Sequence, residues 1–192
     1  PGDQEDLRGR PFVGPAGQLL DRALAQLGLP RQALYLTNAV KHFKFEPRGQ
    51  RRIHKTAAQQ EAAACLDWLE HEIALVRPGA AVALGSTAAC ALLGRPVAVA
   101  SERGQWHQRA DGLRVLVTLH PAALLRMDSC DFDAAFAAWL DDLRLGLERI
   151  RAEAEDAVRS GAGQLVLTDE HQGPDKVGMP MILATSAVHS WL

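Results

Sequence analysis

Short apolar runs alternate with longer amphipathic stretches along this chain, and they predict an alternation of strands and helices. Continuous apolar runs in ALYLTN, GAAVALG and LRVLVTLH predict three buried strands. Helices are predicted over residues 17–29, from Thr56 to about Val76, over residues 86–94 and from about Asp131 to Ser160. Gln59 is expected to form a capping box with Thr56. Residues 1–17 are rich in glycine and proline and predict a loop.

Strands that alternate with helices indicate an α/β fold with three layers, α/β/α, around a mostly parallel central sheet. Ligands bind such sheets at the carboxyl ends of the strands. Asn38 ends the first predicted strand, and His120 ends the third and is followed by Pro121. We therefore expect a site built from Asn38, His120 and the first loop.

Length and composition fit one globular domain with a core, plus a tail, because 47% of the 192 residues are hydrophobic. No run is apolar enough to span a membrane. Three cysteines without a CxxC pair fit a reducing compartment, so we expect a cytoplasmic protein. The chain begins with Pro1 rather than Met, and we expect its true N-terminus to be missing.

A basic loop at residues 41–55 departs from the net charge of -2 of the whole chain. Its cations are Lys41, Lys44, Arg48, Arg51, Arg52 and Lys55, against the single acid Glu46. Phosphate binding is the functional interpretation, because Arg and Lys neutralise backbone phosphates and release counterions. A solvated charged loop is the alternative that charge alone leaves open.

Individual side chains add chemistry, and most of them also have a structural interpretation. His42 and His54 can ligate metal, move protons or act as nucleophiles. His120 either points into a cleft or is a structural cap, and Asn38 either reads a base edge or forms a turn. Phe12 either stacks on a flat ligand or packs in the core.

Five ordered segments resemble the uracil-DNA glycosylase superfamily. They are PGDQEDLRGRPFVGPAG, LYLTNAVKHFKF, QRRIHKT, LGSTAACALLG and TLHPAALLR. They are similar to its iron–sulfur, family-four branch, and KHFKF followed by RRIH resembles the UdgX type, which crosslinks itself to DNA. The resemblance covers about residues 1–150 and implies the glycosylase fold there, truncated at its N-terminus.

The resemblance implies a role for each matching residue. Asp3, with Asp6, belongs to a water-activating motif, Phe12 stacks on the extruded uracil, and Asn38 hydrogen-bonds its edge. His120 stabilises the departing uracil anion, and His54 captures the abasic sugar covalently. The residues expected to contact DNA are Arg51, Arg52, Lys55 and Arg126. The positive charges of Arg51, Arg52 and Lys55 are also expected to lower the pKa of His54.

The resemblance further implies that His42 and Cys65 are two ligands of a [4Fe-4S] cluster. The other two ligands would come from an upstream CxxC, which this chain lacks, so we expect the cluster in the full-length protein and an incomplete site here. His42 and Cys65 should then lie close together in the fold.

The C-terminal segment resembles a different protein. Residues 152–192 are similar to the central region of the glutamate synthase large subunit, and they are too few to carry an active site. We expect a glycosylase-like domain at residues 1–150 and a tail at residues 151–192 that packs poorly on it from about Gly161.

The expected function is excision of uracil from single-stranded or duplex DNA, followed by covalent capture of the abasic sugar through His54. We expect a monomer that does not associate with a membrane. A conventional glycosylase that turns over is the nearest alternative. A non-catalytic DNA-binding remnant and a glutamate synthase fragment are the others.

Overall fold

The computed structural model describes residues 1–159, and only the backbone of Gln59 and residues 149–159. The elements are α1 (Asp3–Arg8), α2 (Pro15–Gln26), the 3-10 helix η1 (Arg31–Ala33), β1 (Phe45–Arg48), β2 (Arg51–His54), α3 (Gln59–Ala63), α4 (Leu66–Val76), β3 (Ala80–Leu84), α5 (Ser86–Leu93), α6 (Val99–Glu102), β4 (Gln105–Gln108), β5 (Arg114–Thr118), α7 (Pro121–Leu124) and α8 (Ser129–Arg159). The prediction about packing of the tail lies outside the described residues.

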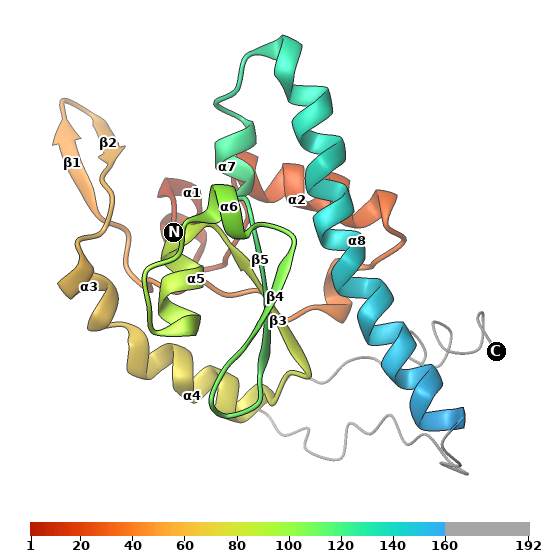
Figure 1. Cartoon of the computed structure of the whole chain (residues 1–192). Helices are drawn as coiled ribbons and strands as arrows, with labels where there is room; N and C mark the ends of the chain where they lie inside the picture. The colour runs from red at the N-terminus through yellow and green to blue at the C-terminus, as the bar shows by residue number, and fades with distance from the viewer. Residues whose placement is uncertain (160–192) are drawn as a thin grey trace.

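The central sheet has the strand order β3-β5-β4 (Figure 1). Successive residues of β5 face opposite sides of this sheet. Val115 and Val117 share a buried cluster with Ala89 of α5, whereas Leu116 approaches Gly146 of α8. Helices α5 and α8 therefore cover opposite faces of the sheet (Figure 1).

The strand pairing corrects the expectation of a mostly parallel sheet. β3 pairs with β5 in parallel, but β4 pairs with β5 antiparallel. The sequence missed β4 because QWHQ offers only one large apolar residue, Trp106. A tight turn at Asp111-Gly112 helps to return the chain into β5, with Gly112 at φ 90°. The described sheet is thus small and mixed, and the complete three-layer arrangement stays a prediction.

The predicted first strand is wrong, because residues 35–38 have no regular secondary structure. Side chains fix this segment instead. Leu34 and Leu36 pack against the core cluster formed by α2, α7 and α8. The Thr37 hydroxyl donates to Glu72 of α4 at 2.8 Å. Apolar content predicted burial here, but it does not decide whether the backbone joins a ladder.

Two predicted helices are confirmed with close boundaries, and a third is divided. α2 is followed by Gly28 at φ 68°, and α5 ends at Gly94 in the left-handed conformation. The helix predicted from Thr56 instead begins at Gln59, because the Glu61 carboxylate accepts from the Ala58 amide at 2.6 Å. It breaks at Cys65, which precedes α4.

The termini of the described chain also differ from expectation in one place. The first motif, predicted as loop, contains the short helix α1, whereas α8 confirms the long C-terminal helix and runs past residue 150 to Arg159. No helix in the described part of the chain is long and apolar enough to cross a membrane.

The basic loop forms a two-stranded antiparallel hairpin, β1–β2, at the periphery of the molecule (Figure 1). Its register runs from Phe45↔His54 at the base to Arg48↔Arg51 at the tip. The two-residue connection begins with Gly49 at φ 60°, a conformation that glycine adopts without strain.

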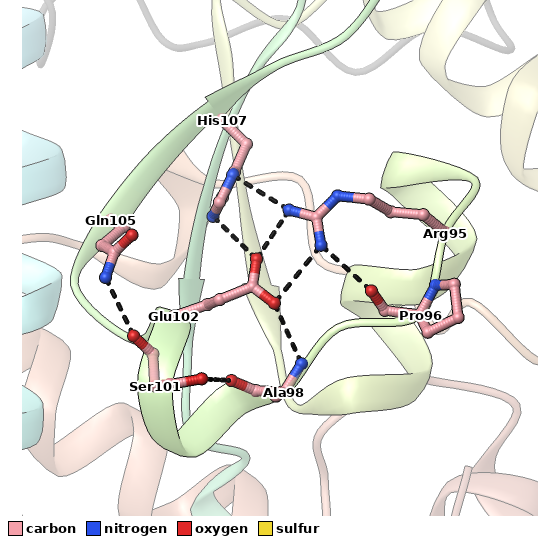
Figure 2. A network of polar contacts seen from close by, with 7 residues as sticks. All are labelled: Arg95, Pro96, Ala98, Ser101, Glu102, Gln105 and His107. Atoms are coloured by element: carbon pink, nitrogen blue, oxygen red, sulfur yellow. Dashed lines mark hydrogen bonds and ion pairs between the residues drawn. The ribbon is translucent and has the colours of Figure 1, made fainter.

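A polar network secures the connection between α5 and β4 (Figure 2). Glu102 accepts from Arg95 Nη2 at 2.6 Å and from the Ala98 amide at 3.0 Å. Arg95 can only donate, so His107 Nδ1, 3.2 Å from Arg95 Nη2, is the acceptor of that contact. This network involves α6 and β4 and leaves the carboxyl end of β5 to other residues.

Candidate active site

His120 occupies the position that its sequence context predicted, just beyond the carboxyl end of β5. It is the N-cap of α7, and its Nδ1 accepts from the Ala122 amide at 3.1 Å. The neutral ring therefore carries its proton on Nε2. Burial lowers the pKa of His120, and the positive charges of the N-terminal amine and Arg126 lower it further. His120 is thus a neutral hydrogen-bond donor.

Phe12 packs on His120, with ring centroids 5.8 Å apart and planes inclined by 28°. Its backbone has φ 51°, a conformation that is uncommon for a bulky residue and that clusters at functional sites. Gly17 makes this geometry possible, because a Cβ at Gly17 would lie 1.9 Å from the Phe12 carbonyl oxygen. Phe12 is buried in the core, as its structural interpretation predicted, and its stacking on a flat ligand stays a prediction.

Two residues that the sequence analysis missed shape this region. Gly85, after β3, has φ 89°, and a Cβ there would lie 3.0 Å from His120 Cβ. Glu5 accepts hydrogen bonds from the amides of Gly2, Val13 and Gly14 at 3.1, 3.1 and 2.8 Å. Burial opposes ionisation of Glu5, but these hydrogen bonds outweigh it and lower its pKa. The only sequence signal was the glycine density of both segments.

Arg52 anchors the hairpin to α1. Its guanidinium lies 2.5 Å from Asp3 Oδ1 and 2.6 Å from Asp6 Oδ2. It also lies over the rings of Phe43 and Phe45, at 5.2 and 5.1 Å from their centroids. This arrangement, here called the Arg52 clamp, joins residues that are far apart in the sequence. It unites three predicted site residues, Asp3, Asp6 and Arg52.

His54 lies at the base of the same hairpin and stacks on Phe43, with ring centroids 5.8 Å apart. Burial lowers its pKa, and the charges of the N-terminal amine and of Arg126 add to this effect. Arg126 therefore acts on both His54 and His120. The shared site of the two histidines stays a prediction.

The source of the field on His54 corrects the sequence expectation. Arg52 is neutralised by Asp3 and Asp6, and Lys55 pairs with Glu46 at 2.7 Å. Arg51 is exposed and does not contribute to the shift of His54. An ion pair cancels most of the potential of its cation, which is why counting charges in the loop misassigned the effect.

Asn38 is half-buried, and its side chain has no hydrogen-bond partner among the described residues. Its amide donor and acceptor are therefore free for a ligand. The structure gives no direct contact between Asn38 and His120 within the described part of the chain, so their shared site stays a prediction.

Cys65 is buried and accepts from the Lys41 amide at 3.4 Å, which places it beside the residue that precedes His42. His42 itself is exposed. The expected [4Fe-4S] cluster takes four ligands. The described residues hold no group of three or more His, Cys, Asp or Glu side chains that could bind a metal. They do not by themselves fit a complete cluster.

Comparison with known proteins links this geometry to a family. The model of the uracil DNA glycosylase superfamily matches residues 1–144. A type-4 uracil-DNA glycosylase of Thermotoga maritima is 39% identical over 127 residues, which cover 66% of this chain and 62% of that protein. The type-4 enzyme of Pyrobaculum aerophilum is 40% identical over 133 residues, covering 66% and 64%. The chain thus spans less than two thirds of either relative.

A second similarity occupies the C-terminal part. The model of the glutamate synthase central domain matches residues 108–192, so it overlaps the first match over residues 108–144. The glutamate synthase [NADPH] large chain of Azospirillum brasilense is 58% identical over 50 residues, which are 26% of this chain and 3% of that protein.

Proposed function

We propose that this chain, which belongs to the uracil DNA glycosylase superfamily, cleaves the bond between uracil and deoxyribose in DNA and then captures the sugar. The observation that carries the proposal is the placement of His120 just beyond the carboxyl end of β5, against Phe12. His54 lies at the base of the hairpin, against Phe43, and Arg126 lowers the pKa of both histidines. The type-4 relatives support uracil as the base and DNA as the partner. The substrate is uracil-containing DNA, single-stranded or duplex.

Binding begins with removal of the nucleotide from the base stack, because an enzyme cannot reach the glycosidic bond inside a duplex. The Phe12 ring offers a flat surface for the extruded base. Asn38 offers its unpartnered amide to the base edge. Gly85 leaves space against His120 that any side chain would fill.

Bond cleavage sends the bonding electron pair to uracil and leaves an oxocarbenium-like sugar. The Nε2–H of His120 donates to the uracil oxygen on which charge develops, which stabilises the transition state more than the ground state. A neutral donor suits this role, because its proton stays on the nitrogen while the uracil anion departs.

Capture of the sugar by His54 is the step that separates this proposal from ordinary turnover. A ring nitrogen of His54 gives its lone pair to C1′, and the proton on the other nitrogen is then lost to solvent. The lowered pKa keeps this lone pair available. Asp3, the expected activator of water, has one carboxylate oxygen engaged with Arg52, which favours attack by His54.

The cluster and the domain division are part of the same proposal. His42 and Cys65 are proposed as ligands in the full-length protein, and no step above depends on a cluster. A boundary at residue 150 is also proposed: the first match ends at residue 144, and the second continues to residue 192.

A denaturing gel with uracil-containing single-stranded DNA tests the function. The parent chain should give a heat-stable band of reduced mobility. His54→Ser should abolish this band and release alkali-labile abasic product, because water can then reach the sugar. His120→Ala should slow both outcomes by impairing bond cleavage.

The matched control is His71→Ser, which removes an exposed histidine of α4 whose Nδ1 lies 2.7 Å from the Asp67 carbonyl oxygen of the same helix. It should behave like the parent, and DNA with thymine in place of uracil should give no adduct. A persistent adduct with His54→Ser would assign the nucleophile to another residue. Abasic product without adduct from the parent would indicate a conventional glycosylase.

A further inference from the structure

The two strands of the β1–β2 hairpin place its charged residues on opposite faces. Directly opposed residues of an antiparallel pair share a face, and successive pairs alternate. The pairs Phe45↔His54 and Pro47↔Arg52 thus share one face, which the Arg52 clamp turns toward α1. The pair Arg48↔Arg51 lies on the other, outer face.

Most cations of the basic loop have acidic partners. Lys41 pairs with Glu72 at 2.6 Å, Lys44 with Glu61 at 2.8 Å, and Lys55 with Glu46 at 2.7 Å. Arg52 is held in its clamp. Within the part of the chain whose side chains are described, Arg48 and Arg51 are exposed and have neither an ion pair nor a hydrogen bond to their side chains.

The arrangement of these two arginines has an energetic cost without a compensating internal contact. Like charges directly opposite each other destabilise a two-stranded pair, and this pair is the last one before the Gly49-Gln50 turn. Cβ atoms of opposed residues lie about 5 Å apart, so two guanidinium groups can converge on one anion. The surrounding acids neutralise the rest of the loop and concentrate its free charge at the tip.

We propose that Arg48 and Arg51 form a phosphate clamp that holds the DNA backbone beside the extruded nucleotide. This inference rests on the proposed function and deepens it, because it divides the loop into two parts. Arg52 positions the hairpin from within, and the outer pair contacts the DNA strand. Lys55, which the sequence suggested for DNA, is instead assigned to its ion pair with Glu46.

The test measures binding of single-stranded oligothymidylate by fluorescence anisotropy over a series of salt concentrations. This probe contains no uracil, so its binding does not depend on excision or capture. Arg48→Gln/Arg51→Gln should weaken binding about tenfold at low salt. The slope of log affinity against log salt should decrease by about 0.7 for each lost phosphate contact. Arg48→Lys/Arg51→Lys should retain most of the slope, since its charges remain.

Arg77→Asn is the matched control. Arg77 ends α4 in a left-handed conformation that Asn tolerates, and it precedes the amino end of β3, opposite to the candidate site. It removes one charge, as each substitution in the hairpin does, and should leave the slope unchanged. If the salt slope of Arg48→Gln/Arg51→Gln equals that of Arg77→Asn, or if the parent does not bind the probe, the proposed phosphate clamp is refuted.

The outcomes separate this inference from the proposed function. At saturating uracil-containing DNA, Arg48→Gln/Arg51→Gln should still form the adduct, which also shows that its hairpin is intact. A parent that binds oligothymidylate through the pair but forms neither adduct nor abasic product would refute the function and leave the clamp standing. An adduct with an unchanged salt slope would refute the clamp alone.

Discussion

The two histidines of the site are held in different ways. His120 follows the central strand of the sheet, caps α7 and packs on the buried Phe12. His54 lies on an exposed two-stranded hairpin, which would be marginally stable alone. Arg52, bound to Asp3 and Asp6, supplies the attachment that the hairpin lacks.

This difference matches the demands of the two proposed steps. Stabilising a leaving group requires a donor at a fixed position, and the sheet end provides one. Capturing the sugar requires a nucleophile that reaches C1′ after the base has departed, and a hairpin held at one point can be adjusted separately. In the proposed mechanism, the bond to uracil therefore breaks at the end of the sheet, and the new bond forms on a separately anchored hairpin.

The largest expected effect comes from Gly17→Ala, which disturbs the packing of Phe12 beside His120. The new Cβ would lie 1.9 Å from the Phe12 carbonyl oxygen, so either α2 or Phe12 must move. We expect the free energy of unfolding in urea to decrease by about 3 kcal/mol. Gly79→Ala is the control, because its Cβ meets open space, and it should stay within about 1 kcal/mol of the parent. Equal stabilities would contradict the close approach.

The next effect concerns Arg52→Ala, which releases the hairpin and leaves the sheet end intact. Adduct formation should slow about 10²-fold, because a displaced nucleophile loses its alignment with C1′. Release of uracil should change much less. Lys44→Gln removes an exposed cation paired with Glu61 and should change the adduct rate by about threefold or less. Parallel loss of both reactions in Arg52→Ala would show that the two parts are not separable.

A smaller effect should appear in the pH dependence. Both histidine pKa values lie below the ordinary value of 6.5, with burial as the main cause. Both rings therefore stay neutral at and somewhat below that pH. We expect the adduct rate of the parent to hold a plateau through pH 6.5 and to fall only at lower pH, as His54 takes up a proton. A decline centred above 6.5 would contradict the lowered pKa.

The same shift has a consequence for stability with a definite sign. A folded-state pKa below the unfolded value means that the unfolded chain binds more protons as the pH falls. The contribution of His120 to the free energy of unfolding is present at pH values above its ordinary pKa. It is lost as the pH falls through the lowered pKa of the folded state. The difference in the free energy of unfolding in urea between the parent and His120→Ala should therefore be smaller in acid than at neutral pH.

The smallest effect is expected for Glu102→Gln, in the network of Figure 2. The hydrogen bond from Arg95 lowers the pKa of Glu102 below 4.5, so its stabilisation is present above that pH and is lost in acid. The difference in unfolding free energy between parent and variant should shrink as the pH falls. Adduct formation should stay unchanged. Glu148→Gln, which removes one carboxylate at an exposed position of α8, is the charge-matched control.

Predictions from local pattern succeeded where a segment's own residues decide its structure. Apolar spacing and terminal glycines located α2 and α5, and the continuous apolar run LRVLVTLH located β5. They failed where contacts with other segments of the chain decide the structure. ALYLTN has strand composition, but Thr37 contacts α4 and Leu36 packs against the core, and neither joins a ladder. Cys65 breaks a helix that the apolar pattern predicted as continuous.

The sequence by itself determined the family and the order of its motifs, and it supplied the two histidines on which the proposal rests. The chemical type of a residue does not depend on the fold, and the ordered motifs identify the residues that carry the chemistry. Only the tertiary structure decided which charges are free, because ion pairing depends on distances between segments far apart in the chain. Arg51 and Arg52 are neighbours in the sequence, yet one faces solvent and the other is bound to α1. The alternation of a β-strand places adjacent side chains on opposite faces, and only the face that carries Arg52 meets the acids of α1.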